Sequence, residues 1–436
     1  MTDDKLVTVP IRPVPGSPSL HDMILRLIWQ EREISRAEVA RRADLARSTV
    51  SEIIGTLLPT GLVAEVGPGP SSGGRRPIVL RFQDEARVIL GVEIGATHVA
   101  VALTDMRGHV LCWAERHHPV RSDPEGTRAL AAELCEECLA AGRKRGSRRL
   151  IGIGVAVPSP VDPRQPERLS EIVLPEWHGR SGLEGLRTRF KVPIFVDNDA
   201  NLGALAEHAW GAGRGIDDFA YVKVGTGIGS GHVIGGEIYR GATGVAGEIG
   251  HMAIDPHGAP CICGLRGCLA TLIGTAALEA RARALLPEYP GSKLADTQPT
   301  ITSIEDAALA GDPLALRVAT EAAEHLGIAL AGMINLMNPA IVILGGGLAR
   351  LGELILKPLR ETVERRTLVS SIAAAEIRTS ELGSRAVAVG AATLVLRAAL
   401  ADPRLLAADG RKPADGRTAR RGARRERTRT AKRMSA

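Results

Sequence analysis

One stretch of 22 residues, Gly247 to Cys268, constrains the fold of this chain most tightly, because it brings one histidine and three cysteines together. It reads GEIGHMAIDPHGAPCICGLRGC, and its candidate ligands are His251, Cys261, Cys263 and Cys268. One imidazole and three thiolates form a donor set that tetrahedral zinc prefers, and four protein ligands leave no position for a catalytic water. We therefore predict a structural Zn²⁺ site. Unliganded thiols in a loop are the alternative.

The residues between and before these ligands fit such a site. Gly264 and Gly267 allow the tight backbone turns that three converging sulfurs require. Glu248 lies one helical turn before His251, so a metal-bound histidine would hold this carboxylate beside whatever pocket it faces. The predicted metal therefore has a positioning role rather than a chemical one.

Residues 19–85 have the pattern of a winged helix-turn-helix. Apolar residues recur at helical spacing over 20–28, and Ser35 with Glu38 forms a capping box that opens a second helix. A short turn leads to a third helix, whose apolar side lies within 50–57. Two short strands around a loop of Gly, Pro and Ser follow, and they predict a hairpin wing. A three-helix packing module with a charged loop is the alternative.

Such a module reads DNA with the first residues of its third helix, which face base edges in the major groove. Arginines at the tip of a wing can approach phosphates or the minor groove. The residues predicted to contact double-stranded DNA are Arg36, Arg47, Ser48, Thr49, Ser51, Arg75 and Arg76. Ala46 precedes the third helix and offers no capping oxygen, which costs about 1 kcal/mol of helix stability but leaves the reading surface intact.

The positive charge of the chain is concentrated at its C-terminal end. Residues 401–436 contain 12 Lys and Arg against 4 Asp and Glu, whereas the rest of the chain contains 43 against 45. We predict a disordered basic tail that attracts DNA in a salt-sensitive manner, with a solvated tail of no dedicated role as the alternative. Residues 1–18 are predicted to be a flexible N-terminus.

Composition predicts a globular cytoplasmic protein. With 44% apolar residues, 436 residues can form two or three domains with sizeable cores. No apolar run approaches the ~20 residues of a membrane span, and the first residues do not resemble a signal peptide, so we expect no membrane partner. The thiol ligands require a reducing compartment. Cys135 and Cys138, on a helix predicted over 129–142, are interpreted as packing residues rather than a redox pair.

The GEIGH and CxCGxxGC motifs, with ten residues from the histidine to the first cysteine, resemble the ROK family of repressors, open reading frames and sugar kinases. Further matches in the family's order are GIGVAVPSPVD at 152–162, VDNDAN at 196–201, GTGIGSG at 225–231 and ILGGGL at 343–348. The resemblance covers roughly residues 86–400, and the preceding block is similar to the winged helix-turn-helix of ROK-type repressors. It implies an α/β fold in which that module precedes a two-lobed, actin-like, sugar-kinase-like (RNase H-like) domain with a sugar cleft.

The same resemblance implies the sugar-binding residues. In the family, the residues that match Asn198 and Asp199 bind sugar hydroxyls, and in the kinases the match of Asp199 is the base that accepts the hydroxyl proton. The residues that match Glu248 and His251 also contact sugar. For Asn198 and Asp199, a strand-end turn in which Asp199 caps the helix at 200–210 is the alternative.

Three positions depart from the pattern of the kinases. Glu93 stands where the first phosphate turn has Asp, Ala96 stands where it has Gly, and Ala270 stands where many members have a sugar-binding Glu. Because phosphoryl transfer depends on positioning and metal-bridged charge, either change in the turn could disable it. Asp105 lies at the spacing of the kinases' second Asp. The residues predicted as vestigial phosphate loops are Gly95, Thr97, Gly225, Thr226 and Gly227.

Together these features predict a sugar-responsive transcriptional regulator of carbohydrate genes, most simply a repressor. Its expected partners are an operator in double-stranded DNA, a sugar or sugar-phosphate effector, and further copies of itself in a dimer or tetramer. One alternative is an ATP-dependent sugar kinase with an appended DNA-binding domain. Another is a constitutive DNA-binding scaffold whose ROK portion only dimerises.

Overall fold

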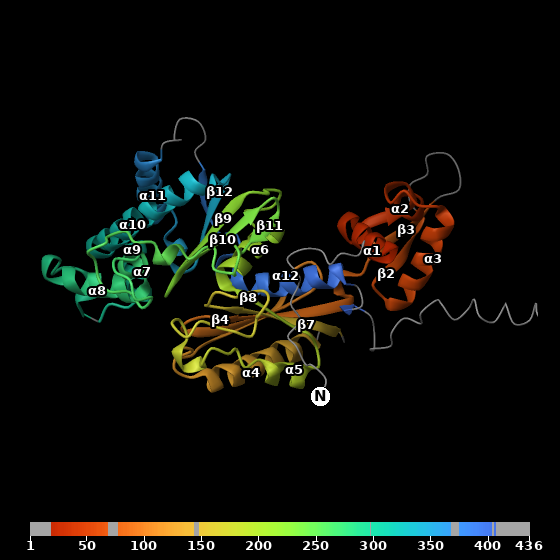
Figure 1. Ribbon diagram of the computed structural model, residues 1–436, viewed down its shortest axis with the longest axis horizontal. Coiled ribbons are helices and arrows are strands. Elements are labelled where there is room, and N and C mark those ends of the chain that lie inside the picture. The colour runs from red at the N-terminus through yellow and green to blue at the C-terminus, as the bar shows by residue number, and fades with distance from the viewer. Residues whose placement is uncertain are drawn as a thin grey trace, which may run out of the picture.

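The computed structural model describes residues 19–68, 77–143, 148–296, 298–367, 375–402 and 405–406, which form a small N-terminal module and two α/β lobes (Figure 1). The elements of the module are α1 (Leu20–Glu31), β1 (Glu33–Ser35), α2 (Arg36–Arg42), α3 (Arg47–Leu57), β2 (Val63–Pro68) and β3 (Ile78–Phe82). Strand β3 pairs antiparallel with both β1 and β2. This arrangement confirms the predicted helices and hairpin wing.

The caps of these helices differ in one respect from the prediction. The Ser35 side chain accepts a hydrogen bond from the Glu38 N–H at 3.1 Å, as expected of an N-cap. The Glu38 carboxylate, however, accepts hydrogen bonds from Arg41 and Arg42 instead of returning to the cap, so the predicted capping box is half formed. Helix α3 begins after Ala46 without a side-chain cap.

The two lobes are built around sheets of the same design. The sheet of the first lobe contains β4 (Arg87–Ile94), β5 (His98–Thr104), β6 (Val110–His117), β7 (Arg149–Val157) and β8 (Ile194–Asn198). That of the second contains β9 (Phe219–Val224), β10 (Ile228–Ile234), β11 (Glu237–Tyr239), β12 (Ile341–Gly345) and β13 (Glu376–Thr379). The orders are β6-β5-β4-β7-β8 and β11-β10-β9-β12-β13. In each lobe an antiparallel meander is therefore extended by two parallel strands, as an actin-like fold requires.

Helices cover both sheets. They are α4 (Pro124–Arg143), α5 (Glu184–Phe190), α6 (Asp199–Trp210), α7 (Ala270–Ile273), α8 (Thr275–Leu285), α9 (Ile301–Leu309), α10 (Pro313–Met337), α11 (Glu353–Arg366) and α12 (Ala386–Ala401). Helices α4 and α5 lie on the outer face of the first sheet, and α12 lies on its inner face; α6 packs between α12 and strands β9 and β10 of the second sheet (Figure 1). Cys135 and Cys138 of α4 are fully buried in the core of the first lobe, which confirms that they are packing residues.

Helix α12 packs very closely against the sheet of the first lobe. A Cβ atom at Gly91 of β4 would lie 1.9 Å from the Ala388 carbonyl oxygen, and one at Gly154 of β7 would lie 1.8 Å from that of Ala391. Glycine is therefore required for the helix backbone to pack this closely on the sheet. The segment Gly383–Ala401 is long and apolar enough to span a membrane, contrary to the expectation from the sequence, but 78% of its most apolar window is buried inside the protein. It is a core helix.

Candidate functional site

A cavity of about 610 Å³ lies between the lobes. Asn198 ends β8, Val224 ends β9 and Gly345 ends β12, so the carboxyl ends of strands from both sheets meet here, where open α/β sheets bind their ligands. Predicted site residues that line this cavity are Glu93, Thr97, Asn198, Asp199, Gly225, Thr226, Gly227, Glu248 and His251. The cleft therefore brings together residues from motifs that are up to 158 positions apart in the sequence.

Asn198 and Asp199 stand at the N-terminus of α6, with different tasks. The Asn198 Oδ1 accepts hydrogen bonds from the N–H groups of Ala200 at 2.9 Å and Asn201 at 3.2 Å, and its Nδ2 donates to the Ser159 carbonyl oxygen. The helix cap is therefore Asn198, and the alternative in which Asp199 fills that role is wrong. The Asp199 Oδ1 accepts a hydrogen bond from the Ala200 N–H at 2.8 Å, which leaves the other carboxylate oxygen, Oδ2, for contacts in the cleft.

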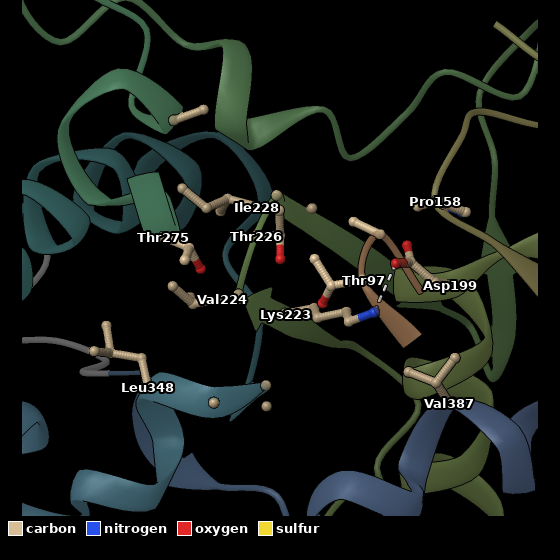
Figure 2. Close-up of a pocket in the computed structure, with 18 of the residues that line it drawn as sticks. Thr97, Pro158, Asp199, Lys223, Val224, Thr226, Ile228, Thr275, Leu348 and Val387 are labelled. Atoms are coloured by element: carbon tan, nitrogen blue, oxygen red, sulfur yellow. Dashed lines mark hydrogen bonds and ion pairs between the residues drawn. The ribbon is translucent and has the colours of Figure 1, made fainter. Parts of the chain in front are cut away.

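That oxygen is bound by Lys223, a residue that the sequence motifs did not mark. The Lys223 Nζ donates to Asp199 Oδ2 at 2.7 Å (Figure 2). It also donates to Glu93 Oε1 at 3.0 Å. Burial alone would raise the pKa of Glu93, but the ammonium and His98 outweigh it and lower that pKa to about 2. Burial alone would lower the pKa of Lys223, but the two carboxylates raise it. Glu93 and Lys223 are therefore both charged at neutral pH.

The two glycine loops differ in how open they are. The His98 ring covers the first turn, since a Cβ at Gly95 would lie 2.4 Å from His98 Cε1. No atom lies within 4 Å of a Cβ built at Gly225 or Gly227, so the second loop borders open space. Asp105 lies outside the cavity lining, and its carboxylate accepts hydrogen bonds from the N–H groups of Arg107 and His109. The kinase-like role that the spacing of Asp105 suggested is therefore not supported.

Glu248 and His251 connect the cleft to the cysteine cluster. The Glu248 Oε2 lies 3.9 Å from His251 Nε2, while the other ring nitrogen, Nδ1, lies 3.5 Å from the Cys261 Sγ. Burial, with the charge of Asp199 nearby, raises the pKa of Glu248 to about 7. Burial lowers the pKa of His251, which favours the neutral imidazole that binds metals. Ala270 lines the same cavity.

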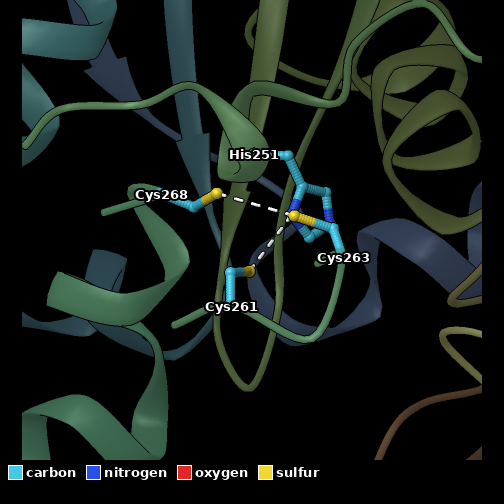
Figure 3. Close-up of side chains that lie close together, drawn as sticks. All are labelled: His251, Cys261, Cys263 and Cys268. Carbon is cyan, nitrogen blue, oxygen red and sulfur yellow. Dashed lines mark hydrogen bonds between the residues drawn. The ribbon is translucent and has the colours of Figure 1, made fainter. Parts of the chain in front are cut away.

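The four predicted ligands form one cluster (Figure 3). Their donor atoms all lie within 4.8 Å of one another, and the Cys263 and Cys268 sulfurs are 3.6 Å apart. Four ligands around a tetrahedral ion with Zn–S bonds of ~2.3 Å would place two sulfurs about 3.8 Å apart. The cluster therefore has the donor set and the spacing to hold a metal ion.

The predicted DNA contacts lie in two regions of the winged helix. Arg47, Ser48 and Ser51 are exposed on α3, and Thr49 is partly exposed beside them. Arg36 forms an ion pair with Glu65 of β2, so it links α2 to the wing. Arg75 and Arg76 lie outside the residues that the structure describes, as does nearly all of the basic tail.

The winged helix is joined to the first lobe by partly buried polar contacts that the sequence did not reveal. The Trp29 Nε1 of α1 donates to the Met106 carbonyl oxygen at 3.0 Å. Arg107 donates to the Trp29 carbonyl oxygen at 2.5 Å, and its guanidinium lies 4.6 Å from the centre of the Trp29 ring. Arg107 also forms an ion pair with Asp84 at 2.7 Å. Arg26 of α1 donates to the carbonyl oxygen of Leu400, near the end of α12, at 2.8 Å.

A winged helix-turn-helix fixed to a two-lobed, sugar-kinase-like domain defines the class of this protein. The ROK family model matches residues 89–398, and the chain belongs to the ROK family. It is 33% identical over 388 residues to a putative xylose repressor of Caldicellulosiruptor sp. (strain Rt8B.4), covering 87% of this chain and 96% of that protein. It is 35% identical over 383 residues to the DNA-binding transcriptional dual regulator NagC of Escherichia coli (strain K12), covering 86% and 92%.

A solved structure agrees with these relatives. The crystal structure of a ROK family transcriptional regulator, described as a homologue of the E. coli MLC protein, is similar with a TM-score of 0.74 at 26% identity. The similarity covers 88% of this chain and 97% of the chain in that crystal structure. The similarity therefore extends over the winged helix as well as the lobes.

Proposed function

We propose that this protein is a sugar-responsive, DNA-binding transcriptional regulator that represses genes of carbohydrate metabolism. The observation that carries the proposal is the direct attachment of a winged helix-turn-helix to the lobe whose inner edge forms the sugar cleft. The proteins to which the chain is similar over most of its length are named as sugar repressors or regulators, in agreement with this function. The molecule would act as a dimer or tetramer on an operator with two-fold symmetry.

The proposed sugar contacts are Asn198, Asp199, Glu248 and His251. Sugar hydroxyls both donate and accept hydrogen bonds, so they match a site that combines carboxylates, an amide and an imidazole. Asp199 and Glu248 accept, Asn198 offers its remaining N–H, and Lys223 adds a donor. Contacts from both lobes would draw the lobes together around the sugar.

The metal that we propose for the cysteine cluster is zinc, held by His251, Cys261, Cys263 and Cys268. A bound zinc ion would supply structure only, because the protein fills all four positions. It would fix the Nδ1 side of His251, so that the Nε2 side and Glu248 face the sugar in a constant orientation.

The proposed DNA contacts are the exposed residues of α3 together with Arg36 and the wing arginines Arg75 and Arg76. A sugar can change DNA affinity only as far as its own affinities for the two lobe arrangements differ. Helix α12 is suited to transmit the shift. Its Val387 lines the cleft. The Leu400 carbonyl oxygen, about 20 Å farther along the helix axis, accepts the hydrogen bond of Arg26.

Replacing Arg107 with Ala should uncouple the two functions. The variant loses the ion pair with Asp84 and both contacts with Trp29, so the winged helix is held less firmly to the first lobe. We expect operator affinity without sugar to stay within about threefold, while the ratio of affinities with and without sugar falls from the ~5–150-fold of typical couplings to below about twofold.

The measurement for this prediction is operator binding by fluorescence anisotropy, with and without sugar. Arg116→Ala is the matched control, because Arg116 is half-exposed on β6 and pairs with Glu137 of α4, away from the winged helix. A full sugar response in the Arg107 variant would show that coupling takes another route.

The kinase alternative meets an obstacle in Lys223. A catalytic base must be free to accept the hydroxyl proton, whereas Asp199 is engaged by an ammonium group at 2.7 Å. The same ammonium binds Glu93, the residue at the first phosphate turn. We expect no sugar-dependent release of ADP from ATP above the rate without protein, and turnover with any sugar in a coupled assay would favour the kinase.

A further inference from the structure

A compact set of charges in the cleft joins the proposed sugar contact Asp199 to Glu93 at the first glycine turn. Lys223 contacts both Asp199 and Glu93, and the side chains are 17%, 14% and 4% exposed, so water screens these charges poorly. Two negative charges face one positive charge. His98, whose Nε2 lies 3.6 Å from Glu93, brings the sum to zero when it is protonated.

We propose that the Lys223–Asp199–Glu93 cluster, in which two carboxylates surround one ammonium, makes this cleft selective for an uncharged sugar over the phosphate of the same sugar. The inference rests on the proposed function and narrows its effector. An ammonium has three N–H donors, and two of them are used by Asp199 and Glu93. The third can donate to one hydroxyl. The positive charge itself is already shared between two carboxylates, so a phosphate would meet at least as much repulsion as attraction.

In both glycine loops, backbone N–H groups that could bind a phosphate are already hydrogen-bonded within the protein. His98 covers Gly95, and the Gly95 N–H donates to the His98 carbonyl oxygen at 2.9 Å. In the second loop, the Gly225 N–H donates to the Gly227 carbonyl oxygen at 3.0 Å. Two of the backbone donors that could cradle an anion are therefore already paired within the protein.

Two other cations line the cavity. Arg350 forms ion pairs with Glu305 at 2.8 Å and Asp306 at 3.4 Å, so its charge is also shared. Arg121 makes no hydrogen bond or ion pair within the described part of the chain, and it is the group that a phosphate could still reach. The experiment must therefore test Arg121 separately.

The test compares matched ligands on the full-length, metal-loaded protein by isothermal titration calorimetry. The probes are glucose, mannose and N-acetylglucosamine, each with its 6-phosphate, and xylose. For a sugar that binds, we expect its phosphate to bind at least about tenfold more weakly. A phosphate that binds more tightly than its parent sugar would overturn the inference while leaving the sugar-responsive function in place. If no probe binds, the sugar site itself is wrong, and the inference falls with it.

Variants at Glu93 separate charge from shape. Glu93→Gln keeps the size of the side chain and removes one negative charge, so the preference for the free sugar should shrink by about tenfold or disappear. Glu93→Asp keeps the charge and should keep the preference. An unchanged ratio in Glu93→Gln, or a preference that appears only when Arg121 is replaced with Ala, would overturn the role of the Lys223–Asp199–Glu93 cluster. If Glu93→Gln does not fold, the wild-type ratio alone decides.

Discussion

Replacing Lys223 with Met should lower the free energy of unfolding by about 3–5 kcal/mol, because it leaves Asp199 and Glu93 in the cleft without their shared cation. The aliphatic part of the side chain is retained, so the loss reports on charge rather than on packing. Chemical denaturation at neutral pH measures it. Lys357→Met, at an exposed lysine of α11, is the matched control and should change stability by less than about 0.5 kcal/mol.

The loss of stability in Lys223→Met should depend on pH, and the pKa of Glu93 sets the direction of that dependence. In the native protein the pKa of Glu93 lies near 2, below its ordinary value of 4.5, so its contribution to stability is present above pH 4.5 and is lost as the pH falls toward 2. Without Lys223, burial dominates and raises this pKa. The variant's deficit should therefore be largest at neutral pH and shrink as the pH falls to about 5. A deficit independent of pH, or one that Glu93→Gln does not reduce, would contradict the proposed charge balance.

Replacing Cys263 with Ser should release the metal and abolish the response to sugar. Structural zinc sites contribute ~10–16 kcal/mol of binding free energy in small peptides, so loss of one thiolate should lower metal affinity by more than about 100-fold. Without the metal, His251 no longer has a fixed Nδ1 side and Glu248 is no longer held toward the cleft. The sugar-induced rise in melting temperature should therefore disappear.

Metal content by plasma mass spectrometry and thermal shift with sugar measure the two effects. Cys112→Ser is the control, since Cys112 is a half-buried thiol of β6 in the first lobe, outside the cluster. We expect it to keep both metal and sugar response. A Cys263 variant that lacks metal yet responds normally to sugar would refute the link between the cluster and Glu248. One that retains metal would refute the ligand set.

Much of the fold could be predicted because short-range patterns encode it. The winged helix follows from apolar spacing and the Ser35 cap, and the cysteine cluster follows from the spacing of Cys261, Cys263 and Cys268. The full length of helix α10, Pro313–Met337, is harder to predict. Its first half buries alanines at helical spacing, and alanines give a weak apolar signal.

The contacts that give the site its chemistry could not be read in this way. Lys223 lies inside an apolar strand, 130 positions from Glu93, and only the meeting of the two lobes brings the groups together. The same holds for Trp29 and Arg107, which are 78 positions apart, and for Arg26 and Leu400, which are 374 apart. A single sequence carries no mark of such long-range pairs.

The most direct test of sugar-controlled DNA binding is a fluorescence anisotropy titration of a labelled duplex taken from upstream of the protein's own gene. The full-length protein is titrated at fixed salt, with and without each sugar, and Arg47→Ala serves as the DNA-binding control. We expect specific binding that one uncharged sugar weakens at least fivefold, and that Arg47→Ala weakens by about 1–3 kcal/mol. Specific binding that no sugar alters, or no specific binding at all, would contradict the proposed regulator.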